Sequence, residues 1–121
     1  MASRISRNSC EGNITMDRFT LNNQLIDFYG KLLSTRQQEI LNYYYYEDLS
    51  LSEIADNLNI SRNAVFDALK KAEEKLNYYE NELHLLADYN FRIEKYNQIK
   101  ELKHDKVNEI IEELLNNEEG Q

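Results

Sequence analysis

The sequence predicts an all-α protein, a helix-turn-helix bundle followed by an extended C-terminal helical arm. The chain has no proline, and no glycine occurs between Gly30 and Gly120, so the two strongest helix breakers are missing from most of it. Along the same stretch apolar residues recur at intervals of three and four, the period of an amphipathic helix. Residues 50–76 also contain two helix-start signals in series.

Composition sets the broad class. A chain of 121 residues is long enough for one domain with a modest core. Cys10 is the only cysteine, which excludes an internal disulfide framework. No apolar run approaches membrane-spanning length and we recognise no signal peptide, so we expect a cytoplasmic protein without a membrane partner.

Residues 1–15 lack apolar periodicity, and we expect them to be a disordered extension. The codons of Glu11 and Gly12 must be purine-rich, like a bacterial ribosome-binding site, and they precede the codon of Met16. One hypothesis is that Met16 is the true start; the alternative is an ordinary flexible N-terminal arm. We place the helix-turn-helix domain at residues 16–78 and the arm, with a frayed polar end, at 79–121.

Two helices are expected before the motif. The first begins near Thr20 and ends near Leu33. The second opens with a capping box formed by Ser34 and Gln37, and it ends near Glu47. The expected inward residues are Leu21, Leu25, Phe28, Tyr29 and Leu32 in the first helix, and Ile40, Leu41 and Tyr44 in the second.

The helix-turn-helix itself comes next. Ser50 and Glu53 have the spacing of a second capping box. Asn59 lies at the turn, where a left-handed residue is needed and asparagine is one of the few substitutes for glycine. Ser61 is the N-cap of the second helix of the motif. The expected inward residues are Ile54, Ala55, Leu58 and Ile60, followed by Ala64, Val65, Ala68, Leu69, Ala72 and Leu76.

Beyond the motif we find no stop signal at Leu76, so we expect this helix to continue to about Asp88, and two further helical stretches follow. They carry more apolar surface than the small bundle could cover, which predicts a partner surface. A homodimer through the arm is the simplest partner. The apolar residues concerned are Tyr79, Leu83 and Leu86, then Phe91, Ile93, Tyr96, Ile99 and Leu102, and finally Val107, Ile110, Ile111, Leu114 and Leu115.

The helix-turn-helix predicts contact with nucleic acid, DNA or structured RNA, through the outward side of its second helix. Arg62 and Asn63 lie where recognition helices read base edges. Lys70 and Lys71 could contact phosphates, but pairing with Asp67 and Glu74 on the same helix is the simpler explanation, and we favour it. The candidate binding residues are Arg62, Asn63, Phe66, Lys70 and Lys71.

Charge argues against the simplest form of this prediction. The net charge is −8, whereas affinity for phosphate comes mostly from lysine and arginine. Residues 77–121 carry eleven acids and five bases (−6), and residues 50–76 carry five acids and four bases (−1). The motif is therefore nearly neutral, while typical nucleic-acid-binding domains are basic.

The tyrosine run, residues 43–46, places rings on several sides of a helix, so not all of them can be core. We expect Tyr44 to be buried. The other three are more typical of a protein interface than of a base-stacking platform.

The segment from Leu32 to Tyr89, LLSTRQQEILNYYYYEDLSLSEIADNLNISRNAVFDALKKAEEKLNYYENELHLLADY, resembles the YlxM-type proteins. These are small bacterial helix-turn-helix proteins related to the fourth region of sigma factors. The resemblance implies a sigma region-four-like fold, no enzymatic activity and a regulatory role in the signal-recognition-particle pathway, with the particle's protein or RNA as a partner. Asp67 departs from the sigma pattern, whose recognition helix is rich in arginine and lysine.

No catalytic or metal constellation stands out. His84 and His104 are the only histidines and lie twenty residues apart, so we expect neither a metal nor another cofactor. The preferred interpretation is a non-enzymatic, nucleic-acid-binding regulatory or accessory protein. The alternative is a protein–protein adaptor whose helix-turn-helix is structural and whose acidic, tyrosine-rich surfaces bind a basic partner.

Overall fold

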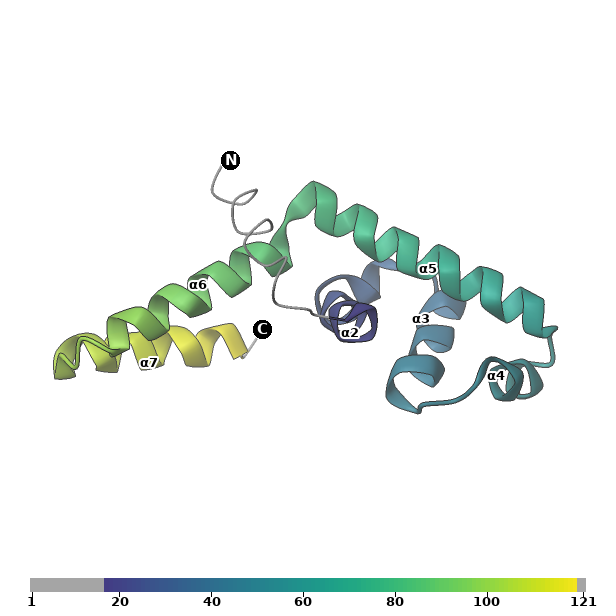
Figure 1. The fold of residues 1–121 in the computed structure, drawn as a ribbon, viewed down its shortest axis with the longest axis horizontal. Helices are drawn as coiled ribbons and strands as arrows, with labels where there is room; N and C mark the ends of the chain where they lie inside the picture. The colour runs from purple at the N-terminus through teal and green to yellow at the C-terminus, as the bar shows by residue number, and fades with distance from the viewer. Residues whose placement is uncertain (1–16, 120–121) are drawn as a thin grey trace. The chain divides into compact units, whose positions relative to one another are not determined.

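The computed structural model describes residues 17–119, so the predictions about residues 1–15 and Met16 lie outside the described part. Within it the chain is helical and has no strand (Figure 1), which confirms the predicted all-α class. The chain divides into two compact units, the first ending at His84 and the second beginning at Leu85. We describe each unit by itself.

The first unit is organised around one long helix, α5, which packs against three others. Its helices are α2 (Arg18–Tyr29), α3 (Thr35–Leu41), α4 (Leu51–Leu58) and α5 (Arg62–Leu83); a short 3-10 turn, η2 (Gly30–Leu32), follows α2, and a π-helical turn, η3 (Asn42–Tyr46), follows α3.

The core of this unit follows most of the predicted stripes. Leu32 is an exception, because the chain leaves the α-helix at Tyr29 and the 3-10 turn carries Leu32 to the surface, where it is 55% exposed. Ala64 is also exposed, since it lies about 100° around α5 from the buried Val65. The fully buried apolar side chains are Leu25, Tyr29, Ile40, Leu41, Ile54, Val65, Ala72 and Leu76.

The tyrosine run differs from the prediction by one residue. Tyr45 is buried and Tyr44 is only half-buried, so the expectation that Tyr44 forms the core is wrong. The reason is the π-helical turn, in which the Glu47 N–H donates to the carbonyl of Asn42, five residues earlier. A five-residue repeat brings Tyr45, rather than Tyr44, onto the inner face occupied by Ile40.

The helix-turn-helix has the predicted start and turn signals. Ser50 and Glu53 form the reciprocal capping box at the start of α4. Asn59 ends α4 with φ 58° and ψ 45°, the left-handed conformation predicted for the turn. The Ser61 hydroxyl then accepts a hydrogen bond from the Ala64 N–H and caps α5.

Helix α5 ends earlier than predicted. It stops at Leu83, because His84 adopts φ 59° and its N–H donates to the Glu80 carbonyl. The expected continuation to about Asp88 is therefore wrong. Histidine is not a strong stop signal in sequence, although it tolerates the left-handed region better than most residues.

The second unit is a helical hairpin made of α6 (Leu85–Lys100) and α7 (Asp105–Glu119), which pack against each other (Figure 1). Arg92 pairs with Glu118 through two hydrogen bonds, the longer 2.9 Å, and this contact lowers the pKa of Glu118. Lys100 pairs with Glu112. No helix within residues 17–119 is long and apolar enough to cross a membrane.

Candidate nucleic-acid interface

The N-terminal half of α5 carries all five predicted binding residues, and all five are exposed. Phe66 is 49% exposed. Among residues 17–119, none of the five side chains makes a hydrogen bond or ion pair. The capped start of α5 therefore presents them to solvent.

Helical geometry brings four of the five together and separates the fifth. Arg62, Phe66 and Lys70 follow one another at intervals of four, and Asn63 lies beside them within about 100°. Lys71 lies nine residues after Arg62, about half a turn away around the axis. One flat surface can therefore contact Arg62, Asn63, Phe66 and Lys70 at once, but it cannot also contact Lys71 centrally.

The favoured pairing of the lysines on α5 is not formed. In the part of the chain that the structure describes, the ion pairs involve Arg18, Arg36, Arg92 and Lys100. Lys70 and Lys71 make none with Asp67 or Glu74. Their charges, like that of the exposed Asp67, remain available to a ligand.

A buried polar network under α5 was not foreseen from the sequence. The Glu73 carboxylate is buried and accepts hydrogen bonds from the Tyr45 hydroxyl and the Arg18 guanidinium. Tyr45 in turn accepts a 3.0 Å hydrogen bond from the amide of Asn22, which is also buried. The available signal was a charged residue on an apolar stripe, since Glu73 lies four residues after Leu69.

The network has an electrostatic consequence at Tyr45. Burial, followed by the hydrogen bond to Glu73, raises the pKa of the Tyr45 hydroxyl well above its usual range. The phenol is therefore a neutral donor at physiological pH. With Arg18 paired to the other carboxylate oxygen, the charge of Glu73 is compensated where α2, η3 and α5 meet.

Comparison with known proteins identifies the family. The family model described as "Putative helix-turn-helix protein, YlxM / p13 like" matches residues 16–117. The chain belongs to the UPF0122 family. This confirms the resemblance seen in the sequence. The family's description names a helix-turn-helix and does not mention a catalytic activity.

Individual UPF0122 proteins are similar over most of their length. One from Malacoplasma penetrans is 46% identical over 94 residues, which cover 78% of this chain and 82% of the relative. One from Caldanaerobacter subterraneus is 46% identical over 85 residues, with coverages of 70% and 73%. YlxM of Bacillus subtilis is 37% identical over 106 residues, with coverages of 84% and 96%.

The two histidines of this UPF0122 protein take part in helix ends. His84 is the left-handed C-cap of α5. The Nδ1 atom of His104 accepts a 3.3 Å hydrogen bond from the Val107 N–H at the start of α7. Within residues 17–119, no cluster of three histidine, cysteine, aspartate or glutamate side chains could hold a metal ion.

Proposed function

We propose that this UPF0122 protein is a non-enzymatic regulatory protein that binds nucleic acid through its helix-turn-helix. The observation that carries the proposal is the exposed and unpaired set Arg62, Asn63, Phe66 and Lys70 at the capped start of α5. The N-terminal residues of such a helix are the ones that reach base edges in helix-turn-helix proteins. Lys71, on another side of the helix, would contact a flanking phosphate.

Binding to duplex DNA and to hairpin RNA, measured over a range of salt concentrations, tests this proposal. Arg62→Ala should weaken binding by about 1–3 kcal/mol if the side chain contacts a base, and Lys71→Ala should flatten the salt slope by about one. Lys106→Ala, which removes an exposed charge from α7, is the control and should leave both quantities unchanged. Equal effects of all three changes would contradict the proposal.

Asp67 offers a second, opposite test on the same helix. Its exposed carboxylate repels phosphate, so Asp67→Lys should strengthen binding to nucleic acid of any sequence. The RNA of the signal recognition particle is the first natural ligand to try, on the strength of the family resemblance alone.

The adaptor remains a competing proposal, favoured by the exposed carboxylates of Glu109 and Glu113 on α7. Residues 85–119 make no hydrogen bond or ion pair with either of these two. A basic protein partner, such as the protein of the signal recognition particle, would bind there by complementary charge. The double change Glu109→Lys and Glu113→Lys should then abolish partner binding, while Arg62→Ala leaves it intact.

We also propose a homodimer through the second unit. Ile110 and Leu114 lie one turn apart on α7 and are 50% and 38% exposed, and Leu102 in the loop before it is 75% exposed. Two copies related by a two-fold axis would cover this apolar surface with itself.

A further inference from the structure

A groove follows one side of α5, and it consists of two adjoining hollows with volumes of about 450 and 280 Å³. The two hollows adjoin at Arg18, Lys70 and Glu73, which line both, and together they are called here the α5 groove. From Phe66 at one end to Asn81 at the other it extends for about 22 Å along the helix, at about 1.5 Å per residue.

One end of the α5 groove is apolar and aromatic. It is lined by Tyr44, Leu51, Phe66 and Leu69. Phe66 is 49% exposed and Tyr44 is half-buried, so both rings can accept a stacked planar group. An exposed aromatic ring stacks well on a nucleobase, because every base has a π-face.

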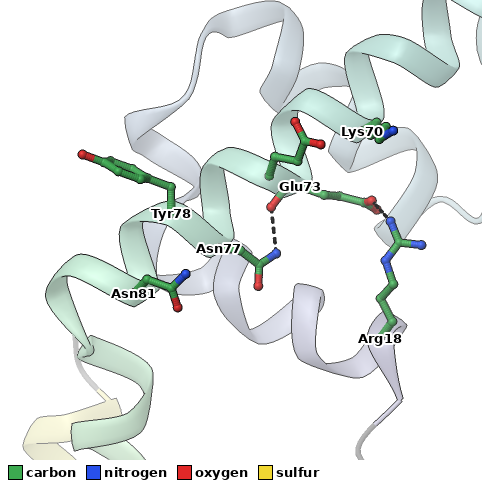
Figure 2. A pocket seen from close by; sticks show the side chains of 7 residues that line it. Arg18, Lys70, Glu73, Asn77, Tyr78 and Asn81 are labelled. Atoms are coloured by element: carbon green, nitrogen blue, oxygen red, sulfur yellow. Dashed lines mark hydrogen bonds and ion pairs between the residues drawn. The ribbon is translucent and has the colours of Figure 1, made fainter.

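The centre of the α5 groove carries two cations. Figure 2 shows the Arg18 guanidinium beside Glu73, to which it donates a hydrogen bond. Because Arg18 uses one nitrogen for this contact and its side chain is 77% exposed, further N–H donors remain free for a ligand. Lys70 has no ion-pair partner within residues 17–119, so its ammonium group is available to a phosphate.

The far end of the α5 groove carries groups that can read the edge of a base. Tyr78 and Asn81 line it beside Asn77, as Figure 2 shows, and the Tyr78 ring is 59% exposed. The Asn77 amide donates a 2.8 Å hydrogen bond to the Glu73 carbonyl, which fixes it and leaves its Oδ1 atom as an acceptor. Glu74, on the same wall, makes no ion pair in the described part of the chain.

We propose that the α5 groove binds a short single-stranded segment of nucleic acid. Bases stack on Phe66 and Tyr78, while Arg18 and Lys70 bind the phosphates between them. A strand is required, rather than a duplex, because its bases are free to unstack onto aromatic side chains and to expose their pairing edges. This inference rests on the proposed function and adds the class of ligand. The ligand is a nucleic acid in which an unpaired strand adjoins the part that the helix-turn-helix binds.

The free carboxylate of Glu74 predicts which bases are preferred. A carboxylate accepts hydrogen bonds from the exocyclic amine of cytosine, and uracil offers no such amine at the same position. Cytosine should therefore bind more tightly than uracil. This difference should disappear in Glu74→Gln, because an amide can donate to the uracil carbonyl as well as accept from an amine.

The test compares a blunt RNA hairpin with the same hairpin extended by about eight unpaired cytosines, a length within the known range of single-strand sites. The full-length protein should bind the extended hairpin at least ten-fold more tightly, because two bases gain an aromatic stacking partner. Tyr78→Ala, which changes a residue of the α5 groove that the proposed helix-turn-helix contact does not use, should remove much of this gain. Tyr43→Ala and Lys75→Ala, which change residues outside the α5 groove, should keep it.

The outcomes separate the two proposals. A gain that is absent, or that survives Tyr78→Ala, overturns the groove as the strand site while binding of the blunt hairpin still supports the helix-turn-helix. Failure to bind either hairpin or the DNA duplex overturns both proposals. A uracil extension that binds as tightly as cytosine overturns the role of Glu74, and a parallel series with a DNA extension shows which sugar the groove accepts.

Discussion

Replacing Tyr45 by phenylalanine is expected to destabilise the first unit far more than the loss of one hydroxyl group at the surface would. In the structure this hydroxyl donates to the buried carboxylate of Glu73 and accepts from the buried amide of Asn22. Tyr45→Phe leaves both of these groups without that partner. A buried polar group left unsatisfied costs about 1–3 kcal/mol; Glu73 keeps its hydrogen bond from Arg18, so the cost falls mainly on Asn22, and we expect the free energy of unfolding to fall by about 1–3 kcal/mol. That is a large part of the roughly 5–15 kcal/mol that stabilises a small domain.

The assay is urea denaturation at neutral pH, with Tyr46→Phe as the matched control. The Tyr46 hydroxyl also donates a hydrogen bond, to Asp27 at 3.1 Å, but the residue is 55% exposed and water can replace the contact. The control should therefore change stability by less than about 0.5 kcal/mol. Equal midpoints for the two variants would refute the reasoning, because the buried network would then contribute nothing.

The same network predicts how stability depends on alkaline pH. Burial and the hydrogen bond to Glu73 raise the folded-state pKa of Tyr45 above its unfolded value of about 10. A raised pKa means that the stabilisation is complete below pH 10 and is lost as the pH rises from there toward the folded-state pKa. The free energy of unfolding of the native protein should fall in this alkaline range, and that of Tyr45→Phe should fall less steeply.

Three further predictions concern the turn, the core and assembly. Asn59 has a left-handed backbone, with φ 58°, so Asn59→Ala should lower the free energy of unfolding by about 1 kcal/mol, while Asn59→Gly should leave it nearly unchanged. Urea denaturation measures both, and equal losses for the two variants would contradict the turn assignment. Ile54 and Val65 are completely buried, so Ile54→Asp or Val65→Asp should unfold the unit by circular dichroism, since an unpaired buried charge costs several kcal/mol. Light scattering should give a dimer mass for the full chain at micromolar concentration and a monomer mass for Ile110→Glu with Leu114→Glu; a monomeric full chain would contradict the homodimer.

The parts of the fold that sequence predicted are those governed by local chemistry. The capping box of Ser50 and Glu53, the left-handed Asn59 and the N-cap Ser61 depend on groups within a few residues of each other, and all three are confirmed. The two C-terminal segments are helical, as the periodicity of their apolar residues predicts.

The parts that sequence missed depend on a change of helical period or on distant partners. A π-helical turn has no reliable residue signature, so the sequence did not show that Tyr45, rather than Tyr44, is the buried residue. Arg18 and Glu73 are 55 residues apart, and only the folded chain shows that they share a groove. The division of the five candidate residues between two sides of α5 is different, because it follows from their spacing at about 100° per residue and could have been read from the sequence.

The acidic character of the chain, with a net charge of −8, bears directly on how such a protein could hold nucleic acid. A binder that relies on a basic patch loses affinity steeply with salt, because each neutralised phosphate releases counterions. The α5 groove offers two cations, Arg18 and Lys70, between aromatic residues. For a single strand the slope of log affinity against log salt is about −0.7 per phosphate contact, so the unpaired extension should add only about −1.4. Stacking on Phe66 and Tyr78 is nearly independent of salt, so the salt slope of the extended hairpin should exceed that of the blunt hairpin by no more than about 1.4. A difference in slope much larger than this would show instead that charge, and not stacking, holds the strand.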